Sequence, residues 1–126
     1  MELSAEHEPI LISASEDYLT LAEAELEMIP FSNGEAGRHQ LAERVVTDLL
    51  NSDYIYMVEL VEGVPKRREI RRLDRAEAIR ASSNPDDWQH YNTDGKPYFA
   101  LSASDKGRAA FFEIISRPRD SQDETR

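Results

Sequence analysis

One stretch of twenty residues decides the fold class: LAERVVTDLLNSDYIYMVEL, residues 41–60. Its first half repeats apolar residues at helical spacing: Leu41, Val45, Val46, Leu49 and Leu50. Asn51-Ser52-Asp53 interrupts this pattern, and the apolar period then changes from 3.6 to 2. Because these two periods belong to helices and strands respectively, we predict a helix over 35–51 and a strand over 54–60.

The predicted strand continues into a β-hairpin. Tyr54, Tyr56, Val58 and Leu60 alternate on one face, and Ile55, Met57 and Glu59 on the other. Turn-forming residues follow at 62–65, and the segment 67–73 can return as a partner strand. Since most residues of the returning arm are charged, the second strand of this hairpin is expected to be polar.

Upstream of this stretch, we expect a flexible lead-in over residues 1–9 and one long helix. Ile10-Leu11-Ile12 can form a short strand or a tether on the core, and Ser13-Ala14-Ser15-Glu16 has the form of a capping box. A helical stripe of apolar residues follows: Leu19, Ala22, Leu26 and Ile29. The pattern predicts a helix of about four turns that ends at Pro30.

Downstream, Asp74 and Glu77 predict a second capping box and a short helix, which the turn residues 82–87 end. A polar loop then leads to a strand over 97–103, and Ser102 or Ser104 caps a final helix. The tail over 118–126 has nothing to bury and is expected to be disordered. Together these elements predict a single α+β domain over 10–117, in which helices cover one face of a small antiparallel sheet.

Composition narrows the class of protein. The chain has 126 residues, no cysteine and a formal net charge of −10 at pH 7. The absence of cysteine excludes disulfides and thiolate chemistry. No apolar run approaches membrane-spanning length, and the acidic N-terminus does not resemble a secretory signal. These observations predict one cytoplasmic domain that does not bind membranes.

The charge is divided unevenly along the chain. Residues 1–63 hold 14 acidic residues against Arg38 and Arg44, a net charge of −12, whereas residues 64–126 hold 11 acidic and 13 basic residues, a net charge of +2. The basic residues crowd between Lys66 and Arg80. Because an acidic chain repels polyanions, this basic cluster is the local exception that could attract them.

No constellation of residues predicts catalysis, a cofactor or a metal. His7, His39 and His90 are not spaced as metal ligands, and we expect all three to be solvated. The chain also lacks a glycine-rich phosphate loop and a nucleophile elbow. Acids meet an aromatic residue at Asp86-Asp87-Trp88, which we interpret either as a turn anchored by Trp88 or as a small active-site loop.

The candidate partner-binding residues are the basic hairpin and nearby aromatic residues: Lys66, Arg67, Arg68, Arg71, Arg72, Tyr54, Tyr56, Trp88 and Tyr91. A hairpin with these cations can follow a phosphate backbone. Alternatively, charges on an edge strand prevent aggregation, and the arginines pair with acidic helices. Tyrosine and tryptophan are favoured at interfaces, although Tyr54 and Tyr56 can equally pave the sheet.

The end of the chain resembles the closing segment of bacterial winged-helix domains. Tyr98-Phe99-Ala100-Leu101 is similar to an aromatic wing strand, and Ser104-Asp105-Lys106-Gly107 to the helix cap that follows it. The helix before the hairpin carries Glu43 and Asp48 beside Arg44, whereas a DNA-reading helix would be basic. The resemblance therefore implies a winged-helix-like scaffold for protein contact or assembly.

Three functional hypotheses remain. The first is a non-enzymatic protein-interaction or regulatory module that binds another protein or itself through an acidic helical face and a basic hairpin, for example as an immunity protein or antitoxin. The second is a winged-helix regulator that contacts nucleic-acid phosphates through the hairpin. The third is a small enzyme that uses the loop around Asp86 and Trp88.

Overall fold

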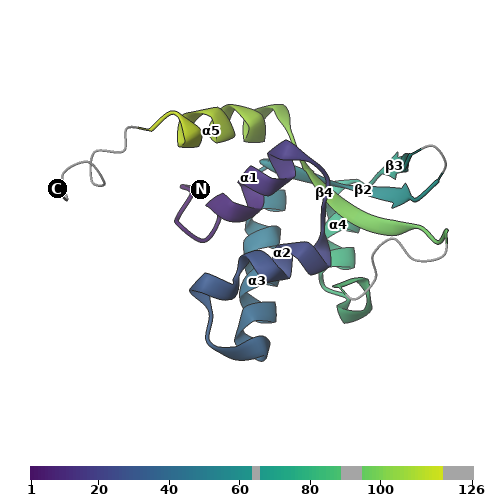
Figure 1. Cartoon of the computed structure of the whole chain (residues 1–126), viewed down its shortest axis with the longest axis horizontal. Helices are drawn as coiled ribbons and strands as arrows, with labels where there is room; N and C mark the ends of the chain where they lie inside the picture. The colour runs from purple at the N-terminus through teal and green to yellow at the C-terminus, as the bar shows by residue number, and fades with distance from the viewer. Residues whose placement is uncertain (64–65, 89–94, 118–126) are drawn as a thin grey trace.

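Helices and strands alternate along the chain (Figure 1). The computed structural model describes residues 1–63, 66–88 and 95–117. Its helices and strands are α1 (Glu8–Glu16), β1 (Leu19–Thr20), α2 (Leu21–Glu27), α3 (Gly34–Asn51), β2 (Ile55–Val61), β3 (Arg68–Arg72), α4 (Arg75–Ser82), β4 (Tyr98–Ala103) and α5 (Asp105–Ile115). Two short 3-10 helices are added, η1 (Ile29–Phe31) and η2 (Pro85–Trp88).

Within the described residues, four strands form one antiparallel sheet in the order β1-β4-β2-β3. β4 lies in the interior of the sheet and pairs with β2 from Ile55↔Ala103 to Leu60↔Tyr98. β3 is an edge strand, and the register of its pairing shifts between Glu59 and Leu60. Helices pack against one face of this sheet, so the predicted α+β class and its architecture are confirmed.

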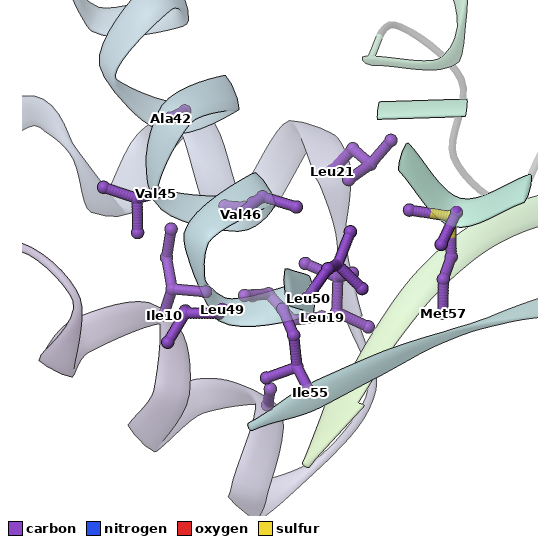
Figure 2. Close-up of a cluster of buried hydrophobic side chains, with 14 of the residues drawn as sticks. Ile10, Leu19, Leu21, Ala42, Val45, Val46, Leu49, Leu50, Ile55 and Met57 are labelled. Atoms are coloured by element: carbon purple, nitrogen blue, oxygen red, sulfur yellow. The ribbon is translucent and has the colours of Figure 1, made fainter. Parts of the chain in front are cut away.

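The main core lies between α3 and the sheet (Figure 2). α3 contributes Val45, Val46, Leu49 and Leu50, which the sequence pattern placed on its apolar stripe. Ile55 and Met57 project from β2 toward these residues, and α1 adds Ile10. Since each such side chain contributes about 1.5–3 kcal/mol when fully buried, this layer is the main source of stability.

The predicted helix over 35–51, the strand over 54–60 and the hairpin are confirmed as α3, β2 and β3. The second capping box is confirmed too, because Asp74 accepts from the Glu77 backbone N–H at 2.8 Å and Glu77 accepts from the Asp74 N–H at 3.2 Å. Of the two serines considered for the last helix, Ser104 is the cap: its hydroxyl accepts from the Gly107 N–H at 3.0 Å.

The prediction of one long helix before Pro30 is wrong. α1 begins directly after His7 with Pro9 in its first turn, and the backbone is extended at Asp17. β1 follows, and Thr20 forms a capping box with Glu23 that starts the separate helix α2. The pairing of Leu19 with Leu101 in the sheet and the Thr20 capping box together outweigh the tendency of the apolar stripe to form one helix. As a result, Leu26 and Ile29 are exposed.

The N-terminal segment also differs from expectation, because His7 is only 4% exposed. Its Nδ1 accepts from the Ser4 backbone N–H at 3.0 Å, so Nε2 carries the proton that is donated to Asp48 at 3.0 Å. His7 is therefore not a solvated histidine. It connects the beginning of the chain to α3, and Ile10 and Leu11 behind it are helical and buried instead of extended.

Replacing Thr20 with alanine tests the observed boundary between β1 and α2. The substitution removes the hydroxyl that accepts from the Glu23 N–H at 3.1 Å, so we expect unfolding free energy to fall by about 1 kcal/mol. Thr20→Ser keeps that acceptor and should recover most of the loss. Urea denaturation followed by circular dichroism measures both variants, and an unaffected Thr20→Ala protein would contradict this boundary.

Candidate partner-binding surface

The cations of the hairpin differ in their surroundings. Every residue of β3 is exposed. Arg71 nevertheless donates to Glu59 on β2 at 3.0 Å and to Glu77 on α4 at 3.1 Å. Hydrogen bonds to Glu77 and then Glu59 raise the pKa of Arg71. The guanidinium is thus neutralised within the chain, and it connects the edge strand to α4.

The tip of the hairpin keeps freer cations. Arg67 forms a long ion pair with Glu62 at 3.8 Å. At the other end of β3, away from the tip, the Arg72 guanidinium lies 3.8 Å from the centre of the Tyr56 ring. In the parts of the chain that the structure describes, Lys66 and Arg68 form no ion pair. The hairpin therefore carries a few available cations at its tip, and its arginines do not form one continuous row.

Tyrosines cover the sheet face opposite the main core. Val58, Leu60, Tyr98 and Ala100 form a second buried cluster there, with Tyr18 and Tyr56 packed against it. Tyr18 precedes β1, yet its hydroxyl donates to Glu69 on β3 at 3.0 Å. The Tyr98 hydroxyl donates to Glu62. These phenols explain how an outer sheet face can bury Val58 and Leu60 completely.

This face should make folding sensitive to alkali. Burial, followed by the hydrogen bond to Glu62, raises the pKa of Tyr98 to about 12 from 10.0. Burial and the bond to Glu69 also raise the pKa of Tyr18. Since the folded state holds the phenolic proton more tightly, stability is intact below pH 10 and falls as pH rises from about 10 to 12, by about 2–3 kcal/mol for Tyr98.

Urea denaturation at pH 9 and pH 11 measures about half of that loss, roughly 1–1.5 kcal/mol, because pH 11 lies midway between the two pKa values. Tyr98→Phe removes the ionisable group, so its stability should change less over this interval than that of the unmodified chain. Tyr54→Phe is the matched control, because Tyr54 lies outside the tyrosine cluster, and it should keep the full loss. Equal alkaline losses in all three proteins would contradict the assignment to Tyr98.

The other aromatic candidates lie elsewhere. Tyr54 precedes β2, and the Lys106 ammonium of α5 lies 4.4 Å from its ring centre. Trp88 is 4% exposed, and its indole N–H donates to the Ser82 carbonyl at 2.8 Å. Tyr91 falls outside the described residues, as does His90. The structure therefore brings Tyr56 and Arg72 together, separates Trp88 from the hairpin, and packs Tyr54 against the main core just before β2.

An acidic groove lies between α1 and α2, and sequence reasoning missed it. We call it the α1–α2 groove; it has a volume of about 490 Å³, and its lining includes Glu16, Asp17, Glu23, Glu27, Tyr18 and Leu26. Among the described residues, no cation lines it. The carboxylates converge because the chain turns back after α1. The prediction of one continuous helix distributed them around the helix surface instead, and therefore did not reveal the groove.

A second groove, the α2–α3 groove, is larger and less acidic. It measures about 730 Å³ and is lined by Ala22, Glu25, Leu26, Glu35, Ala36, His39, Pro85 and Trp88. His39 donates to Glu25 at 3.0 Å and stacks edge-on against Trp88, with ring centres 4.9 Å apart. His39 is thus engaged with protein groups. Asp86 and Asp87, considered for an active-site loop, do not line this groove.

Comparison with known proteins gives no relative: no family model, no curated protein and no solved structure matches this chain. Across residues 1–63, 66–88 and 95–117, no helix has the length and apolar character needed to cross a membrane. Over the same ranges, no three histidine, aspartate or glutamate side chains gather so that they could hold a metal ion.

Proposed function

We propose that this chain is a non-enzymatic protein-interaction module with a winged-helix-like scaffold, which binds a basic surface of a partner protein on the α1–α2 groove. The main observation behind this proposal is that four carboxylates converge around one groove: Glu16, Asp17, Glu23 and Glu27. Among the described residues, no cation lines this groove. Mutual repulsion among these carboxylates is relieved when a cationic surface covers them.

The composition of the groove supports a protein as the partner. Tyr18 and Leu26 lie in it beside the carboxylates. Tyrosine combines a large apolar ring with a polar tip, which suits protein contact surfaces. A basic nucleic-acid-binding enzyme is one such partner, so the immunity or antitoxin hypothesis is a specific form of this proposal.

The basic hairpin is the second element of the proposal. Lys66 and Arg68 are exposed at its tip. Of the other hairpin arginines, Arg67 pairs with Glu62, Arg71 pairs with Glu59 and Glu77, and Arg72 lies over the Tyr56 ring. These cations suit an acidic segment of the same partner and would speed association at low salt. The winged-helix-like assignment is supported by the β4–Ser104–α5 junction and by the position of α3 immediately before the hairpin.

Affinity capture with the full chain as bait tests this proposal. The groove variant Glu16→Lys/Glu27→Gln is compared with Glu2→Lys/Asp86→Asn, which changes net charge equally at exposed positions outside the groove. We expect one protein to be retained by the unmodified and control baits and lost by the groove variant. The purified partner should then bind directly, more weakly as salt rises.

Two results would contradict the proposal. One is the absence of any protein retained specifically by the unmodified bait. The other is equal retention by the groove variant. The nucleic-acid alternative is decided by mobility-shift titration with DNA and RNA at low salt: binding that Lys66→Gln/Arg68→Gln weakens would favour a regulator, because each lost phosphate contact reduces the salt dependence.

A further inference from the structure

Most large apolar side chains exposed on the described surface form two groups. One group lies on α5 and contains Phe112 and Ile115, which are 61% and 55% exposed. The other lies at the end of α2 and on η1, and contains Leu26, Ile29 and Phe31. Since a soluble monomer rarely gathers such residues without a use, both groups call for an explanation.

The exposed face of α5 has the pattern of a helix that docks into a groove. Gly107 is buried, and Ala110 and Ile114 pack against the core, so this side of the helix is occupied. The neighbouring side presents Arg108, Phe111, Phe112 and Ile115, spaced i, i+3, i+4 and i+7, with Phe111 half-buried at its border. This spacing places the anchors of a groove-binding helix on one stripe. Figure 1 shows α5 at the periphery, beside α1 and away from the hairpin.

The α2–α3 groove has the complementary chemistry. Pro85, Trp88, Ala22 and Ala36 give it an apolar lining, and Leu26 from the second exposed group stands at its side. Its carboxylates are Glu25, which already accepts from His39, and Glu35, which is exposed on the first turn of α3. An apolar helix that carries a cation one turn before its anchors matches this combination of lining and charge.

We infer that α5 of one copy docks in the α2–α3 groove of a second copy. Phe112 and Ile115 would contact Trp88 and Pro85, and Arg108 would pair with Glu35. In the isolated chain Arg108 makes a single long hydrogen bond, 3.4 Å to the Ser15 carbonyl. Its remaining guanidinium donors are therefore available for a carboxylate of the partner copy.

The chain cannot fill its own groove with α5. Gly107 lies against the Tyr54 carbonyl, and Arg117 just beyond the helix pairs with Glu8 on α1 at 2.7 Å. These contacts hold α5 beside α1. The inferred contact joins two different surfaces, α5 of one copy and the α2–α3 groove of the other. Two copies can therefore dock into each other reciprocally and form a closed dimer, or the same contact can repeat along a larger assembly. It goes beyond the proposed function, because Trp88, Pro85 and Glu35 lie outside the α1–α2 groove and the hairpin, and the two grooves share only Leu26.

Sedimentation velocity over a concentration series of the full chain provides the first test. We expect concentration-dependent association, weakened at least about tenfold in Phe112→Asp because it removes a central apolar anchor. Ile70→Asp is the matched control, since Ile70 is also an exposed large apolar residue but lies on β3, and it should associate like the unmodified chain. Thermal unfolding of each variant confirms that it is folded.

Mixing two variants tests the pairing of these particular surfaces. Phe112→Asp damages α5 but keeps the groove, whereas Ala36→Lys blocks the groove at an exposed position and keeps α5. Each variant alone should associate poorly, and an equimolar mixture should form a heterodimer through one intact α5 and one intact groove. Emission from Trp88, the only tryptophan, should change as the mixture forms.

Three results would overturn the inference: an unmodified chain that stays monomeric throughout the series, an equal loss in Ile70→Asp, or a mixture that remains monomeric. None of them bears on partner capture by the α1–α2 groove. The two proposals can therefore fail separately.

Discussion

Gly107→Ala should be among the most destabilising single substitutions in this chain. A Cβ atom at position 107 would lie 2.0 Å from the Tyr54 carbonyl oxygen and 3.2 Å from Leu11 Cδ1. That carbonyl cannot move away without loss, because it accepts from both the backbone N–H and the hydroxyl of Ser104 at 3.0 Å. We expect unfolding free energy to fall by about 3 kcal/mol or more, and Tm by roughly 10 °C.

Gly37→Ala is the control for this prediction. Gly37 lies within α3, and an added Cβ would meet no atom within 4 Å. Alanine is the better helix former, so this variant should gain about 0.5–1 kcal/mol. Differential scanning calorimetry compares the two. If both glycine variants shifted Tm in the same direction, the contact between α5 and the beginning of β2 would be wrong.

Trp88→Ala should be comparably severe. The side chain is almost fully buried, packs edge-on against His39 and donates to the Ser82 carbonyl at 2.8 Å. Removing a buried tryptophan costs about 3–5 kcal/mol through lost apolar burial and the cavity that remains. Trp88→Phe keeps most of the ring but leaves the Ser82 carbonyl without this donor, so it should lose a smaller amount, about 1–2 kcal/mol.

Asp86→Ala provides the comparison for Trp88. Asp86 is exposed in the same short helix, and its removal should change stability by less than about 0.5 kcal/mol. Urea denaturation followed by circular dichroism suits all three variants, since it does not depend on tryptophan emission. A Trp88→Ala protein as stable as Asp86→Ala would contradict the interpretation of Trp88 as an anchor and would renew interest in this loop as a site of chemistry.

The sequence predicted best those elements whose pattern is local and unambiguous. In α3 the apolar stripe of Val45 and Leu49 is the buried face. The two faces assigned to β2 are those observed, except that Tyr54, just before the strand, packs against the main core. The first helix failed because Leu19 fits a helical stripe and a strand equally well. Only its pairing with Leu101, distant in sequence, decides between them.

The candidate surface was predictable only in part, for a similar reason. Composition located the basic hairpin, but the partner of each arginine depends on the sheet register and on α4, as the contacts of Arg71 with Glu59 and Glu77 illustrate. The grooves arise from the turn between α1 and α2 and from the packing of η2 beside α3. Neither leaves a periodic signal in the sequence.

The strand order has a consequence for how the chain acquires its structure during synthesis. β4 lies between β1 and β2 in the sheet although it is made after both of them. Until residues 98–103 leave the ribosome, β2 presents a free edge bearing Met57, Val58 and Leu60. The growing chain therefore carries an incomplete sheet with an unpaired strand edge until β4 is made, and termination before Tyr98 should favour aggregation.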